Sequence, residues 1–294
     1  LMDEAAGKSE VIQVTAISTN DLTVVRAYGS TDGEVHASDA TWAIVGQPVQ
    51  EGDETITDIS ADRTQRTQYT QIFKRTVKIS GTREAEAANG MDPGVSSEFQ
   101  LQILRRTMEM KVELNRAALN SIISTNSGSD TVYRTMKGLR EYLLVSGGNN
   151  RTTSEILSEK VVNLMYRDAW DDGGQPDNFI GRAQQFTQFA AFNAGKVRVA
   201  PSDRMAGVFV NKYLTEYGQE LQLNLDRFFR QDEVALLDKK RCWIAPLQGR
   251  GLITEPLAKI GDALRYQILM EATLIVQNQN KAHAYHTNLQ VPSA

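Results

Sequence analysis

The chain has 294 residues, of which 41% are hydrophobic and 23% are charged, a composition that is ordinary for a globular protein with a substantial core. Its net charge of −4 argues against a nucleic-acid-binding protein, which usually needs a basic face, and its apolar runs are far shorter than the roughly 18 residues of a membrane span. The single cysteine, Cys242, excludes an internal disulfide and a multi-cysteine zinc site, and it fits synthesis in a reducing cytosol.

The first 62 residues predict a small acidic β module followed by a polar arm. Two β-rich segments, Val11–Ile17 and Leu22–Tyr28, flank a turn-rich tetrapeptide and therefore predict a hairpin. A third short strand is expected over Thr41–Val45, and Gln50–Asp62 is polar and acidic enough to be a linker. Because the chain begins at Leu1 and not at a methionine, we expect that an upstream piece has been cleaved or left out.

The next 21 residues reverse the charge. Residues 1–62 carry twelve acidic and two basic side chains, whereas residues 63–83 carry six basic side chains and no acidic one. Apolar residues of one parity over Tyr69–Ile79 predict a strand with one wet face. Each block could be only a solvated surface, but an acidic arm before a basic strand gives copies of the chain complementary surfaces for a head-to-tail contact. The residues predicted to make that inter-subunit contact are Arg63, Arg66, Lys74, Arg75, Lys78 and Arg83.

The longest uninterrupted pattern predicts a helix over Asp92–Thr125. Asp92 is a suitable N-cap and Pro93 suits the first helical position. No glycine or proline interrupts Val95–Ile123, and apolar residues recur mostly at steps of four. At 1.5 Å per residue this helix would extend about 50 Å, nearly three times the length of an ordinary helix of about 12 residues. We expect sheets to lie across it.

The remaining chain predicts an α/β block and a closing strand. Helices are expected over Ser154–Asp172 and Ala183–Asn193, and a final strand over Leu264–Gln277. That strand is apolar on both parities and has no local partner, so it is expected to return to the sheet on the long helix. Shorter strands are expected over Phe179–Gly181, Val197–Ala200, Ala206–Val210, Leu221–Leu225, Val234–Leu237 and Trp243–Ala245.

The reactive residue types give a poor case for catalysis. On a strand, a spacing of three would place His283 and His286 on opposite faces, so we interpret them as part of a polar tail and not as metal ligands. His36 falls in an expected loop. Cys242 follows three cations that could activate its thiol, but a buried small hydrophobe is the favoured interpretation. The phosphate-binding loop and the nucleophile elbow are both absent from the sequence. We predict no catalytic residue, no metal and no cofactor.

Several segments, in this order, resemble the major capsid proteins of tailed bacteriophages with the Hong Kong 97-like fold, and most of all the SU-ten-type family. They cover roughly residues 65–290. The matching segments are Tyr69–Phe73 and Val77–Thr82 before the long helix, then Met136–Leu139, Trp170–Asp177, Thr254–Asp262, Glu271–Leu274 and Asn278–His283.

The resemblance implies an α+β phage major capsid fold with a long spine helix, to which this chain adds a small β module. Its regions would be 1–90, the N-terminal and extended-loop region with the β module; 91–149, the peripheral domain with the spine helix; 150–260, the axial domain; and 261–294, the return strand of the peripheral domain and a C-terminal tail.

The same resemblance implies a structural protein and not an enzyme. It would be made in the host bacterial cytoplasm and would assemble with itself, as pentamers and hexamers, into the icosahedral head around double-stranded DNA. Portal, decoration and scaffolding proteins are further expected partners, and DNA would be held only loosely. Two alternatives stay open: an encapsulin-like compartment shell protein, and a hydrolase or binding module with an appended β domain.

Overall fold

The computed structural model describes residues 1–5, 7–46, 48, 51–52, 60, 65–85, 97–192 and 212–290. The chain divides into two compact units, an N-terminal unit, Leu1–Thr64, and a C-terminal unit, Gln65–Ala294. Several predictions fall outside the described residues, namely Arg63, the helix start at Asp92 and Pro93, and the strands at 197–200 and 206–210. Within the described part of the chain, no helix is both long and apolar enough to cross a membrane.

The N-terminal unit contains two pairs of short strands. Strand β2 (Gln13–Ser18) and strand β3 (Asp21–Val25) form the predicted hairpin, while β1 (Met2–Asp3) pairs with β4 (Trp42–Ala43), which is shorter than expected. Side chains on both faces of the hairpin are largely exposed. Ile12 is the one buried apolar residue among those described in this unit. A lone two-stranded hairpin is marginally stable, so other contacts must hold this unit together.

The long helix of the C-terminal unit, α2, runs from Glu98 to Asn120, and the hydroxyl of Ser97 caps it by accepting the Gln100 N–H at 3.3 Å. Its 23 residues extend about 34 Å. The prediction that it continues to Thr125 is wrong, because Ser121 adopts an extended conformation. Tertiary hydrogen bonds hold the chain there: the Gly138 N–H donates to Ser121 O at 2.8 Å, and the Ile123 N–H donates to Glu141 at 2.7 Å.

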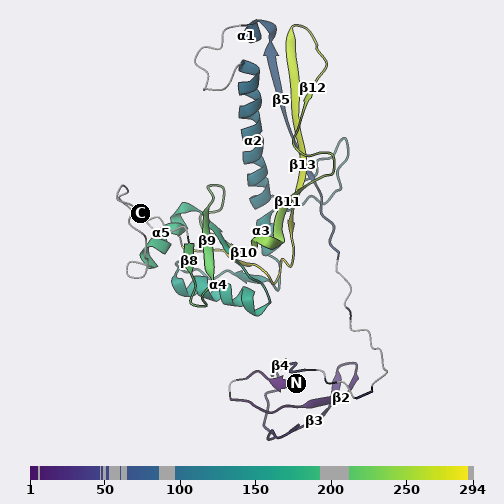
Figure 1. Cartoon of the computed structure of the whole chain (residues 1–294), viewed down its shortest axis with the longest axis vertical. Coiled ribbons are helices and arrows are strands. Elements are labelled where there is room, and N and C mark those ends of the chain that lie inside the picture. The colour runs from purple at the N-terminus through teal and green to yellow at the C-terminus, as the bar shows by residue number, and fades with distance from the viewer. Residues whose placement is uncertain are drawn as a thin grey trace. The chain divides into compact units, whose positions relative to one another are not determined.

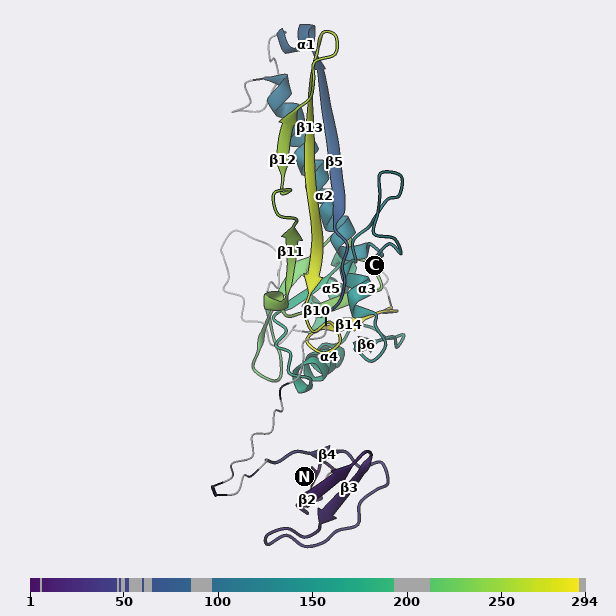
Figure 2. The same ribbon diagram turned by 90° about the vertical axis from the view of Figure 1, so that its right-hand side faces the viewer.

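An antiparallel sheet, which we call the helix-backed sheet, packs on α2. The closing strand β13 (Ala263–Val276) pairs with all ten residues of β5 (Gln71–Ser80), as its apolar pattern predicts. Strands β11 (Cys242–Pro246) and β12 (Ile253–Pro256) also pair with β13, and Figure 2 shows them beside β13 on the side away from β5. The short helix α1 (Gly81–Ala85) follows β5. The buried residues between helix and sheet are Phe73, Val77, Ile79, Met110, Ala118, Met136 and Ile268.

A second, six-stranded sheet has the order β6-β14-β10-β7-β9-β8. Its strands are β6 (Asn149–Arg151), β7 (Asn178–Gly181), β8 (Lys212–Leu214), β9 (Glu220–Leu225), β10 (Val234–Leu237) and β14 (Ala284–His286). Its helices are α4 (Glu159–Asp171) and α5 (Ala183–Phe192) (Figure 1). Helix α5 is close to prediction, whereas α4 begins five residues later than predicted, because the side chain of Ser158 caps it there by accepting the Val161 N–H. The short helix α3 (Leu139–Leu143) and the 3₁₀ turn Lys239–Arg241 lie in the connections.

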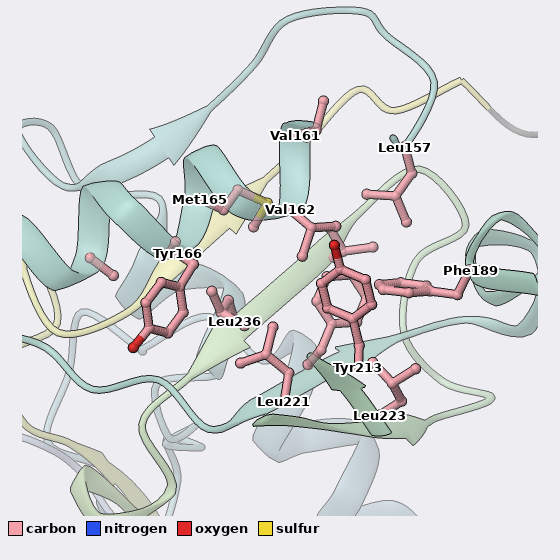
Figure 3. Packing of buried hydrophobic residues seen from close by; sticks show 14 of the residues in the cluster. Leu157, Val161, Val162, Met165, Tyr166, Phe189, Tyr213, Leu221, Leu223 and Leu236 are labelled. Atoms are coloured by element: carbon pink, nitrogen blue, oxygen red, sulfur yellow. The ribbon is translucent and has the colours of Figure 1, made fainter. Parts of the chain in front are cut away.

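Helix α4 and this sheet enclose an apolar core. Figure 3 shows Val162 and Met165 of α4 above Leu221 and Leu236 of the sheet. The Tyr213 ring faces Phe189 of α5 with 5.4 Å between the ring centroids. This core is therefore distinct from the one between α2 and the helix-backed sheet.

The division between the two sheets does not follow the predicted boundary at residue 260. Strands β11 and β12 precede that boundary yet belong to the helix-backed sheet, whereas β14 follows it and pairs with β6 and β10 in the six-stranded sheet. The interpretation of His283 and His286 as part of a polar tail is also wrong, because 1% and 0% of their surfaces are exposed. The C-terminal residues return into the core and do not trail into solvent.

Candidate assembly surfaces

The thiol of Cys242 is not activated. Burial and the nearby carboxylates of Asp238 and Asp177 raise its pKa to about 12. His283 lies near, with Nε2 3.8 Å from Sγ, but Nδ1 of that ring accepts the Asp238 N–H at 3.1 Å. Nε2 therefore carries the proton and donates it to Gln277 O at 3.1 Å, so the ring cannot deprotonate the thiol. This geometry leaves Cys242 unreactive, but the prediction of a buried residue holds only in part, because Cys242 is partly exposed.

The other buried histidine, His286, is also held by its neighbours. Its ring nitrogens face the carboxylate of Glu155 at 2.9 Å and the carbonyl oxygen of Thr287 at 2.8 Å. Among the residues that the structure describes, no three His, Cys, Asp or Glu side chains gather into a group that could hold a metal ion.

The structure separates the six basic residues of the predicted contact. Lys74 and Lys78 point outward from β5, on the face opposite α2. Arg75 shares the parity of Phe73 and forms an ion pair with Glu113 of α2 at 2.5 Å. Arg83 pairs with Glu98 at 3.2 Å. Two of the predicted contact residues are thus already paired within the chain.

Arg66 is exposed in the segment before β5, and Arg63 lies outside the described residues. The side-chain ammonium groups of Lys74 and Lys78 have no hydrogen-bond or ion-pair partner in the described part of the chain. Arg265 of β13 lies directly opposite Lys78 in the strand register, and its buried Nε has no hydrogen-bond partner there either. Like charges at directly opposite positions are destabilising. An acidic surface placed over this face would relieve that repulsion.

A groove of about 440 Å³ lies where β5 meets α2. It is lined by Lys74, Arg75 and Thr76 of β5 and by Arg106 and Glu109 of α2. Arg106 is bound to Glu109 at 2.7 Å, and Arg75 to Glu113. Lys74 therefore supplies the uncompensated charge of this groove.

The helix also exposes an apolar stripe. Leu104, Met108 and Val112 follow one another at steps of four residues along α2, and 45%, 56% and 39% of their surfaces are exposed. The sequence pattern predicts that apolar residues occupy more than one face of the helix, and these three form the face turned away from the core. Contiguous exposed apolar surface often marks a contact with another protein.

Two buried carboxylates that the sequence analysis did not identify fasten the C-terminal unit. Glu271 of β13 accepts hydrogen bonds from the Thr70 hydroxyl at 2.5 Å and from Arg134, and it pairs with Arg250 at 2.7 Å. The sequence did contain one sign of a buried carboxylate here, because Glu271 is the only acidic residue in the apolar run of residues 263–276. Glu271 thereby ties the segment before β5 to the sheet.

Glu233 has a similar role at the six-stranded sheet. It pairs with Arg140 at 3.0 Å and Arg230 at 3.3 Å, and it accepts the Tyr285 hydroxyl at 2.6 Å. Burial and the adjacent carboxylate raise the pKa of Tyr285 well above its usual value. The hydroxyl therefore remains a donor to Glu233, and this network joins α3 to β10 and β14.

The N-terminal unit is organised around His36. Its Nδ1 lies 2.6 Å from Asp3 and its Nε2 2.8 Å from Glu10, while its ring packs 4.6 Å from that of Trp42. Both carboxylates are buried, and Arg26 also pairs with Glu10 at 2.5 Å. Hydrogen bonds to these carboxylates raise the pKa of His36, and the same contacts lower the pKa values of both acids, with Arg26 the largest cause at Glu10. We call the four side chains of Asp3, Glu10, Arg26 and His36 the histidine clamp.

Comparisons with solved structures find similar folds in phage capsids and in an encapsulin. The satellite phage P4 procapsid with its size determination protein is 12% identical, with a TM-score of 0.56 over 89% of this chain and 84% of that one. The cyanophage A-1(L) capsid is 10% identical, with a TM-score of 0.55 over 74% and 77%. The SrpI encapsulin of Synechococcus elongatus PCC 7942 is 16% identical, with a TM-score of 0.51 over 76% and 75%.

At the level of sequence, a search of curated proteins found no match. In contrast, the profile of one family, the SU10 major capsid protein, matches residues 8–290. That range includes almost all of both units and every residue of the surfaces described above except Asp3 of the histidine clamp. The chain belongs to the SU10 major capsid protein family.

Proposed function

We propose that copies of this chain assemble, as pentamers and hexamers, into the icosahedral head that encloses the double-stranded DNA of a tailed phage. The observation that carries the proposal is the family match over residues 8–290. The phage P4 and cyanophage structures support it through the fold alone, since their sequence identities are only 12% and 10%.

The two sheets suggest how one subunit would be divided. In this proposal α2 and the helix-backed sheet form the peripheral domain, and the six-stranded sheet with α4 and α5 forms the axial domain around which copies gather. The axial domain then consists of residues from about 145 to 241 together with the C-terminal strand β14. The N-terminal unit, which includes the acidic segment 51–62, would reach toward a neighbouring subunit.

A container must release its contents. Each protein cation placed on a phosphate strengthens binding to DNA, whereas this chain has a net charge of −4. We therefore propose loose, non-specific contact with packaged DNA. We propose portal, decoration and scaffolding proteins as further partners of such a head.

The contents of the particle test this function against its nearest alternative. The SrpI encapsulin neighbour, described as a holo complex, makes a compartment shell the second candidate. Particles purified from the native source would be treated with nuclease and then examined for protected DNA and, by mass spectrometry, for co-purifying proteins. Protected DNA with portal or tail proteins supports the phage head. An enzyme cargo without protected DNA would instead support a compartment.

The basic face of β5 is the part of the predicted contact that we propose lies against acidic surface of an adjacent subunit. Its charges are Lys74 and Lys78, which have no partner in the described residues of their own chain. The variant Lys74→Glu/Lys78→Glu should form fewer particles than the unchanged chain, as measured by light scattering. A matched control, Lys160→Glu/Lys240→Glu, reverses two exposed lysines elsewhere and should assemble normally. Equal assembly of both variants would refute this contact.

A further inference from the structure

Strand β5 has a free edge. It pairs with β13 on one side, and no other described strand pairs with it. Figure 2 shows β5 as the outer strand of the helix-backed sheet. Because backbone groups of a strand point alternately to its two sides, about half of the N–H and C=O groups of β5 face away from β13. A free edge of ten residues is a template for an added strand.

The groove between β5 and α2 follows this edge. All its lining residues come from β5 and α2 and none from β13, so the groove lies on the side of β5 that is away from its partner strand. Figure 2 shows α2 behind the sheet and β5 at the outer edge of that sheet. The ammonium groups of Lys74, in the groove, and of Lys78, four residues further along β5, have no partner in the described chain. The edge therefore suits an extended segment that carries negative charge.

The sequence contains one segment with these properties. Residues 51–62 carry five acidic side chains and no basic one, the highest density of negative charge next to the basic stretch. Four of the five residues in Thr55–Ile59 are β-branched, the residue type that favours strands. Each copy of the chain supplies one such segment and one such groove, so the contact can repeat from copy to copy around a closed ring.

We propose that residues 51–62 of a second copy lie along the free edge of β5 as an added strand, with their acidic side chains near Lys74 and Lys78. This inference rests on the proposed function, since it names the segment and the groove through which neighbouring subunits meet. Backbone hydrogen bonds would hold the strand, and the charges would select its partner.

Disulfide trapping tests the contact in the full chain. In a Cys242→Ala background, Thr76→Cys on β5 is combined in turn with Thr55→Cys, Thr57→Cys or Ile59→Cys, because neighbouring strands bring opposed residues within disulfide range. At least one combination should give a ladder of disulfide-linked multimers on a non-reducing gel, which reduction collapses. The matched control moves the first cysteine to Thr254, an exposed residue of β12 on the opposite edge of the sheet, and should give no ladder.

The outcomes separate this inference from the proposed function. If the Cys242→Ala chain forms particles but no Thr76→Cys combination cross-links, or Thr254→Cys links equally well, the inference is wrong and the shell function stands. A disulfide within one chain would exclude the second copy as the occupant. A chain that stays monomeric in light scattering would overturn both.

Charge exchange gives a second, independent measurement that does not depend on the register of the added strand. The variant Lys74→Glu/Lys78→Glu should form fewer particles. When Glu54→Lys and Asp58→Lys are added to the same chain, the number of particles should return to that of the unchanged chain. Loss without restoration would show that the acidic segment is not the partner of these lysines.

Discussion

Glu271 is expected to be the most sensitive single position of the helix-backed sheet. Only 2% of its side chain is exposed, and it holds Arg134, Arg250 and the Thr70 hydroxyl together. The substitution Glu271→Gln preserves the size of the side chain and one hydrogen-bond acceptor, but it removes the ion pairs with Arg134 and Arg250. Breaking a fully buried pair costs about 3–5 kcal/mol. Because 30% of the Arg134 and 44% of the Arg250 side chain is exposed, solvent screening reduces the expected loss to about 2–3 kcal/mol.

The loss can be measured by urea denaturation of the full chain, at a concentration where light scattering shows no particles. For a unit of this size, each kcal/mol lowers the melting temperature by roughly 2–4 °C, so thermal unfolding should shift by about 4–12 °C. Glu109→Gln is the matched control. It breaks the ion pair with Arg106, in which both side chains are more than 40% exposed, and should cost less than about 1 kcal/mol. Equal losses in the two variants would refute the reasoning.

Two further predictions concern the histidine clamp and a close backbone contact. Because the pKa of His36 is raised, protonated His36 stabilises the N-terminal unit fully below pH 6.5, and this contribution disappears as the pH rises through the raised pKa. Because the pKa values of Asp3 and Glu10 are lowered, their contribution is present above about pH 4.5. Hydrogen-exchange protection of residues 8–36 should therefore fall from pH 6 to pH 9, and a His36→Gln variant should show no such fall. At Gly174 a Cβ would meet Ala282 backbone at 2.7 Å, so Gly174→Ala should destabilise by about 1–3 kcal/mol in the same urea assay. Gly251→Ala, which meets nothing within 4 Å, should be neutral.

The sequence predicts best where a pattern is local. The apolar run of β13 identified a covered strand, and its lack of a nearby partner indicated the return to β5. The end of α2 was missed because hydrogen bonds from Gly138 and to Glu141, both more than 15 residues away, hold the chain extended after Asn120. Periodicity along one helix contains no information about such partners.

The contacts that fasten each unit were the hardest to predict. The histidine clamp joins Asp3, Glu10 and His36 across 26 to 33 positions, and no spacing rule connects them. The division of the basic stretch was accessible in part, since Arg75 shares its parity with Phe73 and therefore faces α2. The sequence could not indicate that Glu113 of α2 is the ion-pair partner of Arg75.

Negative-stain electron microscopy of the purified full chain tests the central claim most directly. If the chain is a shell subunit, it should form closed, hollow particles of icosahedral outline, and dilution or the Lys74→Glu/Lys78→Glu substitution should reduce their number. A uniform field of separate single subunits, at concentrations where the chain is folded by circular dichroism, would contradict the account.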